Sequence, residues 1–426
     1  MSRDRVGAAI DRLHDAQDLL NSCTWIRTDR VDREDGEGPL AGMPIVVKDL
    51  IDQAGLPTTC GSGFLRDPAV GNAPVIDRLL EAGSVLVGRA NLHEFAYGFS
   101  SENPWFGPVR NPRDPATSPG GSSGGSAVAV AAGLVPAAIG TDTGGSVRVP
   151  AALTGIYGLK VTHGRVPVAG VFPLAPSLDT VGPLSRDAAT LDLVYRALAG
   201  LGRPAAPHPM EGVRVGLPEQ WLDCPDLDAL TRQEFDQTAS ALEKAGAELV
   251  RIDDPVLVPW GMIQELAGAE AAASHRAFRA AGRPYGAEVS DRLDKAETVT
   301  MEEYISAHRW RTTLVEAFAR AFHIVDVLAT PAVASRRKVI GDDRINGSHY
   351  RPVLSWFSAL VNHAGAPAIA IPWLGREPGS RADGSRPPFS LQLVAPPWQE
   401  DRLLGLARSL EEAGMAGFTR PPVYLE

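Results

Sequence analysis

Cysteine, lysine and long apolar runs are all scarce in this chain of 426 residues. The chain has three cysteines, namely Cys23, Cys60 and Cys224. Their odd number and irregular spacing argue against a disulfide framework or a metal site, so we expect reduced thiols in a cytoplasmic protein. The longest apolar run, residues 127–139, is too short to cross a membrane, and residues 1–20 lack the apolar segment of a signal peptide.

Basic residues are too few and too dispersed for a nucleic-acid surface. The formal net charge is −10, and the arginines are scattered along the chain. Because binding to a phosphate backbone needs clustered basic side chains, we expect no direct nucleic-acid partner and no membrane contact. A hydrophobic content of 44% with 22% charged residues is typical of an ordinary globular protein, and this length allows a large buried core.

Glycine and serine are concentrated in residues 118–150. This stretch reads SPGGSSGGS, then an apolar run that predicts a short Ala/Val helix, then GTDTGGSVRVP. Glycine admits positive φ and close approach, and a helix start leaves backbone N–H groups free, so a serine held here is suited to acyl transfer. A flexible linker is disfavoured by the apolar run, and a phosphate-binding loop lacks the lysine it would need after Gly125. From the residues alone, a purely structural role of the glycines in turns stays open beside acyl transfer.

Lys48 is the second feature that invites a chemical explanation. The chain contains five lysines, and this one directly follows an apolar strand pattern at residues 44–47. The other basic residues are almost all arginine, so a lysine in this position calls for an explanation. The alternative from the residues alone is a strand-end lysine whose amine reaches water.

Periodicity, caps and turn residues outline the remaining elements. Helices are expected at residues 6–20, 73–82, 226–245, 300–322 and 399–413, with a further short helix capped by Asn91 and ending at Phe95. Strands are expected at residues 84–88, 213–216, 248–252, 324–329, 368–371 and 389–394. Loops are expected at residues 29–38, 201–212 and 375–388. The alternation of strands and helices indicates an α/β layered core.

Several segments together resemble the amidase signature family. They are GMPIVVKD at residues 42–49, GGSSGGS at 120–126, GTDTGGSVRVP at 140–150, the stretch 155–165, and SLDTVGP at 177–183. The resemblance implies an α/β fold whose central mixed sheet is covered by helices on both faces. It also implies one domain over residues 1–426, with a catalytic core at 1–200, the remaining sheet and helices at 201–426, and a helical cover at 255–323. Val161 and His163 depart from the family pattern, outside the residues that carry the chemistry.

The same resemblance implies a role for each residue of the site. Ser146 corresponds to the nucleophile, Ser122 to a bridging serine that follows a cis peptide bond, and Lys48 to the base. The backbone N–H groups of the oxyanion hole would come from Thr143, Gly144 and Gly145, together with Ser146 itself. Supporting roles fall to three residues, Ser123, Asp142 and Arg148. No metal or organic cofactor is implied.

These roles predict an amidohydrolase that cleaves a linear carboxamide through a serine acyl-enzyme. Two alternatives stay open: the glutaminase subunit of a tRNA-dependent amidotransferase, which would need partner chains, and an inactive binding or scaffold protein. A small-molecule amide is the expected partner, and a homodimer is compatible with this reading. Cys60 is less favoured as a nucleophile than as a buried or loop thiol. A serine–histidine triad is also less favoured, because no Gly-x-Ser-x-Gly elbow is formed; packing or surface roles are expected for His163, His323, His349 and His363.

The sequence does not identify the amide that the protein hydrolyses. The loop at residues 97–106 carries Tyr97, Phe99, Trp105 and Phe106 just ahead of the serines, and aromatic side chains commonly line binding pockets. We therefore expect the acyl and leaving-group pockets to depend on this loop and on the segments around Phe172 and Trp356.

Overall fold

A computed structural model describes residues 3–29, 37–259, 261–375 and 387–425. Its main sheet contains β1 Cys23–Ile26, β2 Pro44–Lys48, β3 Val85–Ala90, β6 Ala137–Asp142, β7 Tyr157–Lys160, β8 Thr180–Ser185, β9 Arg214–Pro218, β10 Glu248–Ile252, β11 Val327–Pro331, β14 Ala368–Trp373 and β15 Phe389–Val394. Two short pairs lie outside this sheet, β4 Glu102–Asn103 with β5 Gly107–Pro108 and β12 Arg344–Ile345 with β13 Ser348–His349.

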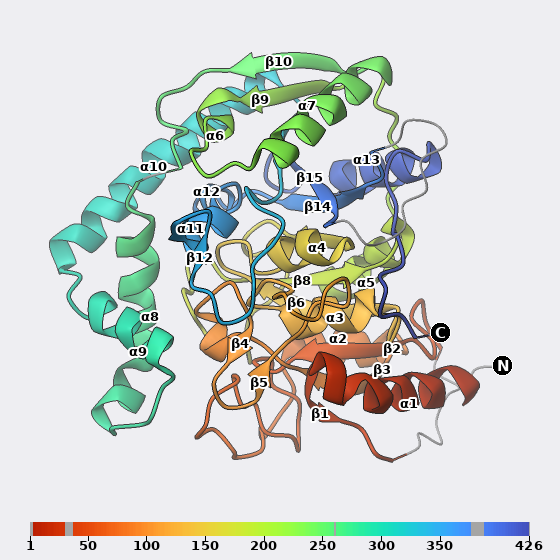
Figure 1. Cartoon of the computed structure of the whole chain (residues 1–426), viewed down its shortest axis with the longest axis vertical. Helices are drawn as coiled ribbons and strands as arrows, with labels where there is room; N and C mark the ends of the chain where they lie inside the picture. The colour runs from red at the N-terminus through yellow and green to blue at the C-terminus, as the bar shows by residue number, and fades with distance from the viewer. Residues whose placement is uncertain (1–2, 30–36, 260, 376–386, 426) are drawn as a thin grey trace.

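The helices follow the same chain order. They are α1 Arg3–Leu20, α2 Pro74–Glu81, α3 Gly124–Ala131, α4 Arg148–Thr154, α5 Ala188–Ala199, α6 Glu219–Leu222, α7 Ala229–Lys244, α8 Ile263–Ala280, α9 Ala287–Ala296, α10 Met301–Ile324, α11 Tyr350–Ser355, α12 Ala359–His363 and α13 Glu400–Glu412. A 3-10 turn, η1, spans Glu94–Ala96. Helices α8, α9 and α10 stand together beside the sheet, on the left of Figure 1.

Within the described residues, the eleven strands of the main sheet run in the order β1-β3-β2-β6-β8-β7-β14-β15-β11-β9-β10. Neighbours β2 and β6 are parallel, whereas β6 and β8 are antiparallel, so the sheet is mixed. Figure 1 shows the sheet passing through the middle of the molecule with helices on either side. The expected α/β fold with a central mixed sheet is therefore confirmed.

Alternate residues of the central strands belong to two separate cores. Val46 of β2 packs in a cluster with residues of α1, α3 and α4, whereas Ile45 and Val47 pack in a second cluster with residues of α2, α5 and α13. Successive side chains of a strand point to opposite faces, so a strand buried on both faces reads as a continuous apolar run. The PIVV pattern before Lys48 has this origin.

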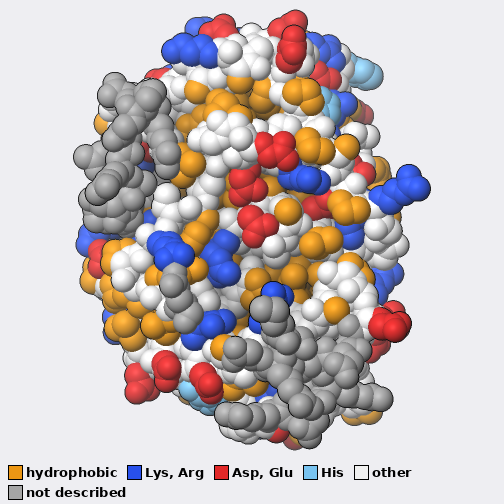
Figure 2. All heavy atoms as spheres, turned by 90° about the vertical axis from the view of Figure 1, so that its right-hand side faces the viewer, with side chains coloured by type: hydrophobic (Ala, Val, Ile, Leu, Met, Phe, Trp, Pro, Cys, Tyr) orange, Lys and Arg blue, Asp and Glu red, His pale blue; other side chains and the backbone are white. Residues whose placement is uncertain are grey.

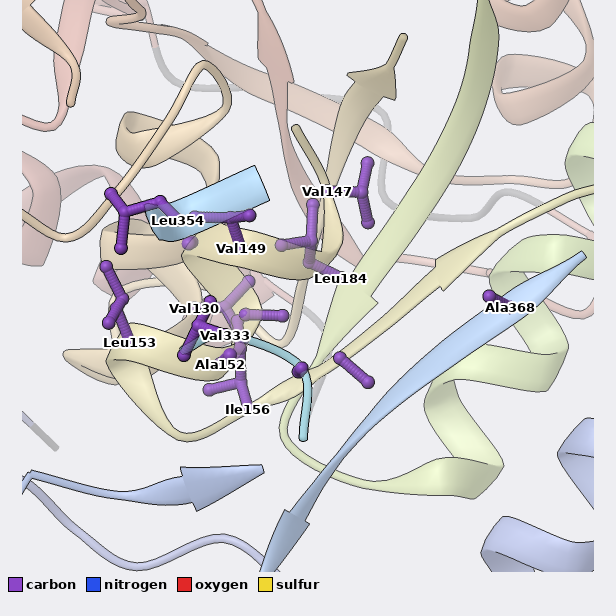
Figure 3. Packing of buried hydrophobic residues seen from close by; sticks show 14 of the residues in the cluster. Val130, Val147, Val149, Ala152, Leu153, Ile156, Leu184, Val333, Leu354 and Ala368 are labelled. Atoms are coloured by element: carbon purple, nitrogen blue, oxygen red, sulfur yellow. The ribbon is translucent and has the colours of Figure 1, made fainter. Parts of the chain in front are cut away.

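Helix α4 is held rigidly against the first of these cores. Its residues Val149, Ala152 and Leu153 are buried and pack among side chains of α3, β8 and α11 (Figure 3). Burial of such side chains contributes about 1.5–3 kcal/mol each for valine and leucine. The loop between β6 and α4 is therefore anchored where it joins α4.

Most of the expected elements are present, with two corrections. The helix predicted from Asn91 to Phe95 is wrong: only the 3-10 turn η1 forms, and Phe95 and Ala96 have left-handed φ values of 50° and 57°. The Asn91 side chain donates to the Asn21 and Gly107 carbonyls instead of capping a helix. The apolar run 127–139 divides between the end of α3 and the start of β6.

Some expectations fall on residues outside the described part of the chain. The loops predicted at 29–38 and 375–388 lie largely there. The division into residues 1–200 and 201–426 stays a prediction, although α8, α9 and α10 fall within or just beyond the predicted cover at 255–323. Acidic and basic side chains are interspersed over the face seen in Figure 2. Among the helices that are described, none has the length and apolar character to span a membrane.

Candidate active site

Strand β2 delivers Lys48 into the interior of the molecule. The strand lies between β3 and β6, all five of its residues are buried, and Lys48 is fully buried at its end. The Lys48 Nζ donates to three hydroxyl oxygens, at 2.6 Å to Ser122 Oγ, 2.9 Å to Thr141 Oγ1 and 3.0 Å to Ser123 Oγ. Burial lowers the pKa of Lys48 to about 7, while the charges of nearby acidic groups oppose the shift.

Ser122 lies directly before helix α3, in the first glycine-rich segment. The peptide bond between Gly121 and Ser122 is cis, as the family resemblance implied. Ser122 is fully buried, and its carbonyl accepts hydrogen bonds from the His93 N–H at 3.2 Å and the Ser101 hydroxyl at 3.4 Å. Two hydrogen bonds to one carbonyl thus hold the backbone of the residue whose hydroxyl contacts Lys48.

Ser146 lies in the loop between β6 and α4, at the wall of a cavity. Its carbonyl accepts a hydrogen bond from the Ser123 N–H at 3.2 Å, which ties the two serine segments together. In the described part of the chain, no hydrogen bond joins Ser146 Oγ to Ser122 Oγ directly. Lys48 and Ser122 are therefore in contact, and Ser146 lies next to them on the cavity side.

The loop before Ser146 presents backbone N–H groups, with one correction to the expected set. The Gly145 N–H donates to Asp142 Oδ1 at 2.8 Å and is therefore occupied. The N–H groups of Thr143, Gly144 and Ser146 have no acceptor among the described residues. The Thr143 hydroxyl donates to Asp179 Oδ1 at 2.6 Å, which fixes the other end of the loop.

A buried ion pair between Asp142 and Arg148 stabilises this loop. Arg148 donates to Asp142 through Nε and Nη2, each at 3.0 Å, and through Nη1 to Gln392 Oε1 at 2.8 Å. The Asn362 side chain bonds both partners of the pair. Burial alone would raise the pKa of Asp142, but the charge and hydrogen bonds of Arg148 hold it well below its ordinary value. Asp142 and Arg148 thus brace the loop.

A cavity of about 60 Å³ opens beside Ser146. Its apolar lining includes Ala96, Phe99, Leu174, Ile263, Ala267 and Ala359, and its polar lining includes Tyr97, Thr143, Gln264, Arg292, Ser355 and His363. Tyr97 and Phe99 come from the aromatic loop expected to form a pocket. Phe172 instead packs against Phe95, with ring centroids 5.1 Å apart, and neither it nor Trp356 is part of the lining.

Arg292, from helix α9, was not anticipated from the sequence. Its Nη1 donates to the Tyr97 carbonyl at 2.6 Å, and its guanidinium lies 3.6 Å from the centre of the Tyr97 ring. No carboxylate of the described residues lies within ion-pair distance of it. Helix α9 carries no motif that would have marked this arginine, which is far from the glycine-rich segments in sequence.

The less favoured nucleophiles and bases lie elsewhere or have other roles. Cys60 is fully buried, and burial raises its pKa well above the ordinary value, which disfavours a reactive thiolate. His363 lines the cavity, but its Nδ1 is held by the Ala359 carbonyl at 3.0 Å, and burial lowers its pKa to about 4. The other three histidines considered, His163, His323 and His349, are not part of the cavity lining. Among the described residues, no group of His, Cys, Asp and Glu side chains is suited to a metal ion.

The chain is similar to known proteins in both sequence and structure. The sequence pattern of the family "Amidase" matches residues 4–404. The chain is 38% identical to a glutamyl-tRNA(Gln) amidotransferase subunit from Deinococcus deserti, over 91% of this chain and 86% of that protein. It is 33% identical to the AtzE subunit of 1-carboxybiuret hydrolase from Pseudomonas sp. strain ADP, over 89% and 85%. A solved amidase structure superposes with a TM-score of 0.88 at 30% identity, covering 97% of this chain and 96% of that one.

Proposed function

The chain belongs to the amidase family of enzymes, which act on carbon–nitrogen bonds, and on this premise we propose that it hydrolyses a linear carboxamide through an acyl-enzyme on Ser146. The observation that carries the proposal is the buried contact of 2.6 Å between Lys48 Nζ and Ser122 Oγ, next to Ser146 at the cavity wall. A serine hydroxyl needs a base to become a nucleophile, and this contact supplies one.

Lys48 serves as the base in its neutral form. With a pKa of about 7, a substantial fraction of Lys48 is unprotonated at neutral pH. As the Ser146 oxygen forms its bond to the substrate carbonyl carbon, its proton passes to Ser122, and Ser122 gives its own proton to Lys48. A change of the Ser146 side-chain rotamer on substrate binding brings its hydroxyl to Ser122, because catalytic hydrogen bonds are often long before substrate is present.

The N–H groups of Thr143, Gly144 and Ser146 stabilise the negative charge that develops on the carbonyl oxygen. Donors of this kind contribute about 3 kcal/mol each in acyl transfer. When the C–N bond breaks, the proton returns through Ser122 to the leaving nitrogen. Water then attacks the acyl-enzyme, and the same relay accepts its proton. As the bond between the acyl carbon and the Ser146 oxygen breaks, the relay returns that proton to Ser146, and the carboxylic acid product is released and ionises to a carboxylate.

Arg292 indicates an acidic substrate. A cation at the cavity wall without an ion-pair partner among the described residues suits a carboxylate, which can accept two parallel hydrogen bonds from a guanidinium. Ala96, Phe99 and Leu174 give part of the same cavity an apolar lining. We therefore propose an amide whose reacting group lies at Ser146 and whose other end carries a carboxylate.

The similarity to glutamyl-tRNA(Gln) amidotransferase subunits favours a second candidate, a glutaminase that works with partner chains. The two candidates share the chemistry and differ in the need for a partner. The purified chain alone should release ammonia or an amine from a panel of acidic and neutral amides in the first case. In the second case, glutamine hydrolysis should appear only when chains that copurify from the source cell are restored. An inactive scaffold would release nothing in either assay and would not react with a fluorophosphonate.

A further inference from the structure

Thr141 contacts the Lys48 amine, although no catalytic role has been given to it above. Lys48 lies at the end of β2 and Thr141 near the end of β6, and these neighbouring strands are parallel, with Val47 opposite Ile139. The Thr141 side chain is buried, and its Oγ1 lies 2.9 Å from Lys48 Nζ. Gly140 leaves room for the third hydroxyl, because a Cβ there would lie 2.7 Å from Ser123 Oγ.

The three hydroxyls match the three N–H bonds of a protonated amine. An ammonium group has three donors and no acceptor, and Ser122, Ser123 and Thr141 each place one oxygen within 3.0 Å of Lys48 Nζ. Ser123 can only accept from Lys48, because its own proton goes to the Thr141 carbonyl at 3.2 Å. Each N–H of the charged amine thus has one oxygen, although the amine is cut off from water.

We propose that Thr141 is a positioning residue that, together with Ser123, solvates the ammonium form of Lys48 after the relay has delivered its proton. This inference rests on the proposed function for its catalytic meaning. The effect of Thr141 on the Lys48 ammonium can be measured without turnover, because removing the Thr141 hydroxyl takes one of three acceptors from a buried cation. A buried ammonium left with an unpaired N–H is destabilised relative to the neutral amine, so the base becomes weaker.

Other charged groups also act on Lys48 and are kept constant in the test. Asp142 is paired with Arg148, and Asp49 is paired with Arg89, so neither offers its carboxylate to Lys48. The titratable groups that influence the Lys48 amine are, in decreasing order, Asp142, Asp179 and Cys60. None of these three donates to or accepts from the Thr141 hydroxyl, so a Thr141 variant leaves their hydrogen bonds in place.

The test is an NMR titration of protein carrying lysine labelled with ¹³C at Cε. Only five lysine signals are expected, and Lys48→Met identifies the signal of Lys48. Thr141→Val, which keeps the shape of threonine without its oxygen, should lower the pKa of Lys48 by about one to two units, since a hydrogen bond to a charged group has that worth. Thr141→Ser should restore the wild-type value. Thr238→Val, at a buried threonine of α7 far from the site, should change nothing.

The acid limb of kcat/KM should move to lower pH in Thr141→Val. The plateau should fall by a factor smaller than the change in the Lys48 acid constant, because a weaker base removes the proton less readily. A Lys48 pKa that is unchanged or raised in Thr141→Val overturns the inference, and so does a failure of Thr141→Ser to restore it. If valine distorts β6, Thr141→Ala removes the same oxygen and must shift the pKa in the same direction. Failure of the proposed function is detected in a separate experiment, as the absence of a fluorophosphonate adduct on wild-type Ser146. The titration of Lys48 does not depend on that result.

Discussion

Arg148 faces Asp142 through two parallel hydrogen bonds of 3.0 Å in a fully buried pair directly behind the nucleophile loop. The same Asp142 carboxylate accepts the N–H groups of Gly145 and Val147, on either side of Ser146. The ion pair therefore transmits the rigidity of α4 to the loop that carries the proposed oxyanion donors.

Arg148→Ala should lower both stability and turnover. It leaves the Asp142 charge buried and unpaired, which costs about 3–5 kcal/mol of unfolding free energy. Arg320→Ala, which breaks a pair with Asp254 near the surface, is the matched control and should cost less than about 1 kcal/mol. Denaturant unfolding and kcat, measured on both variants, check this. Wild-type turnover in Arg148→Ala would show that the loop holds its geometry without the pair.

The activity should have an acid limb set by Lys48. Because the pKa of Lys48 is lowered to about 7, protonation removes the base as the pH falls through that value, and kcat/KM should fall tenfold per pH unit below it. Lys48→Met should remove most of the rate, and Lys48→Arg should be nearly as damaging, because arginine keeps its proton. Near-normal activity in Lys48→Arg would remove Lys48 from the mechanism.

Native stability should rise between pH 7 and 8.5. Burial lowers the pKa of Lys48 and of Lys160 to about 7 in the folded protein, from 10.5. Above pH 7 the unfolded chain therefore binds more protons than the folded chain, and unfolding free energy increases by up to about 1.4 kcal/mol per pH unit and group. Lys160→Met and Lys48→Met should each flatten this slope, whereas Lys244→Met, at an exposed lysine, should leave it unchanged. A wild-type slope of zero or below would contradict the assignment.

Arg292→Gln should raise KM for acidic amides and spare neutral ones. A lost hydrogen-bonded contact to a carboxylate costs about 1.5–3 kcal/mol, which corresponds to a ten- to hundredfold rise in KM. Arg309→Gln, at an exposed arginine of α10, is the control. Equal effects of Arg292→Gln on acidic and neutral amides would show that Arg292 supports the cavity without reading the substrate.

The parts of the site that lie in contiguous motifs were accessible from the sequence. Lys48, Ser122 and Ser146 each end or begin a segment whose glycines and apolar residues already determine its local structure. The sequence predicts Gly145 among the oxyanion donors because it does not reveal that the Gly145 N–H donates to the Asp142 carboxylate. Asn91 looked like a helix cap, but tertiary contacts to the Asn21 and Gly107 carbonyls take its amide.

Arg292 and Thr141 were missed for a different reason. Arg292 reaches the cavity only because α9 packs beside the loop that carries Tyr97, and this long-range contact leaves no local pattern. Thr141 lay inside a recognised motif, but its importance depends on the register between β2 and β6. A sequence reading identifies the segments that meet; the pairing of strands decides which of their side chains touch.

The central claim is that Ser146 attacks the substrate. Treatment with a fluorophosphonate followed by tryptic digestion gives one peptide, residues 114–148, that contains both Ser122 and Ser146. Fragment ions that break within residues 127–139 assign the adduct to one serine or the other. Wild type should carry the adduct on Ser146 and Ser146→Ala should carry none, whereas an adduct on Ser122 or Cys60, or none in wild type, would contradict the account.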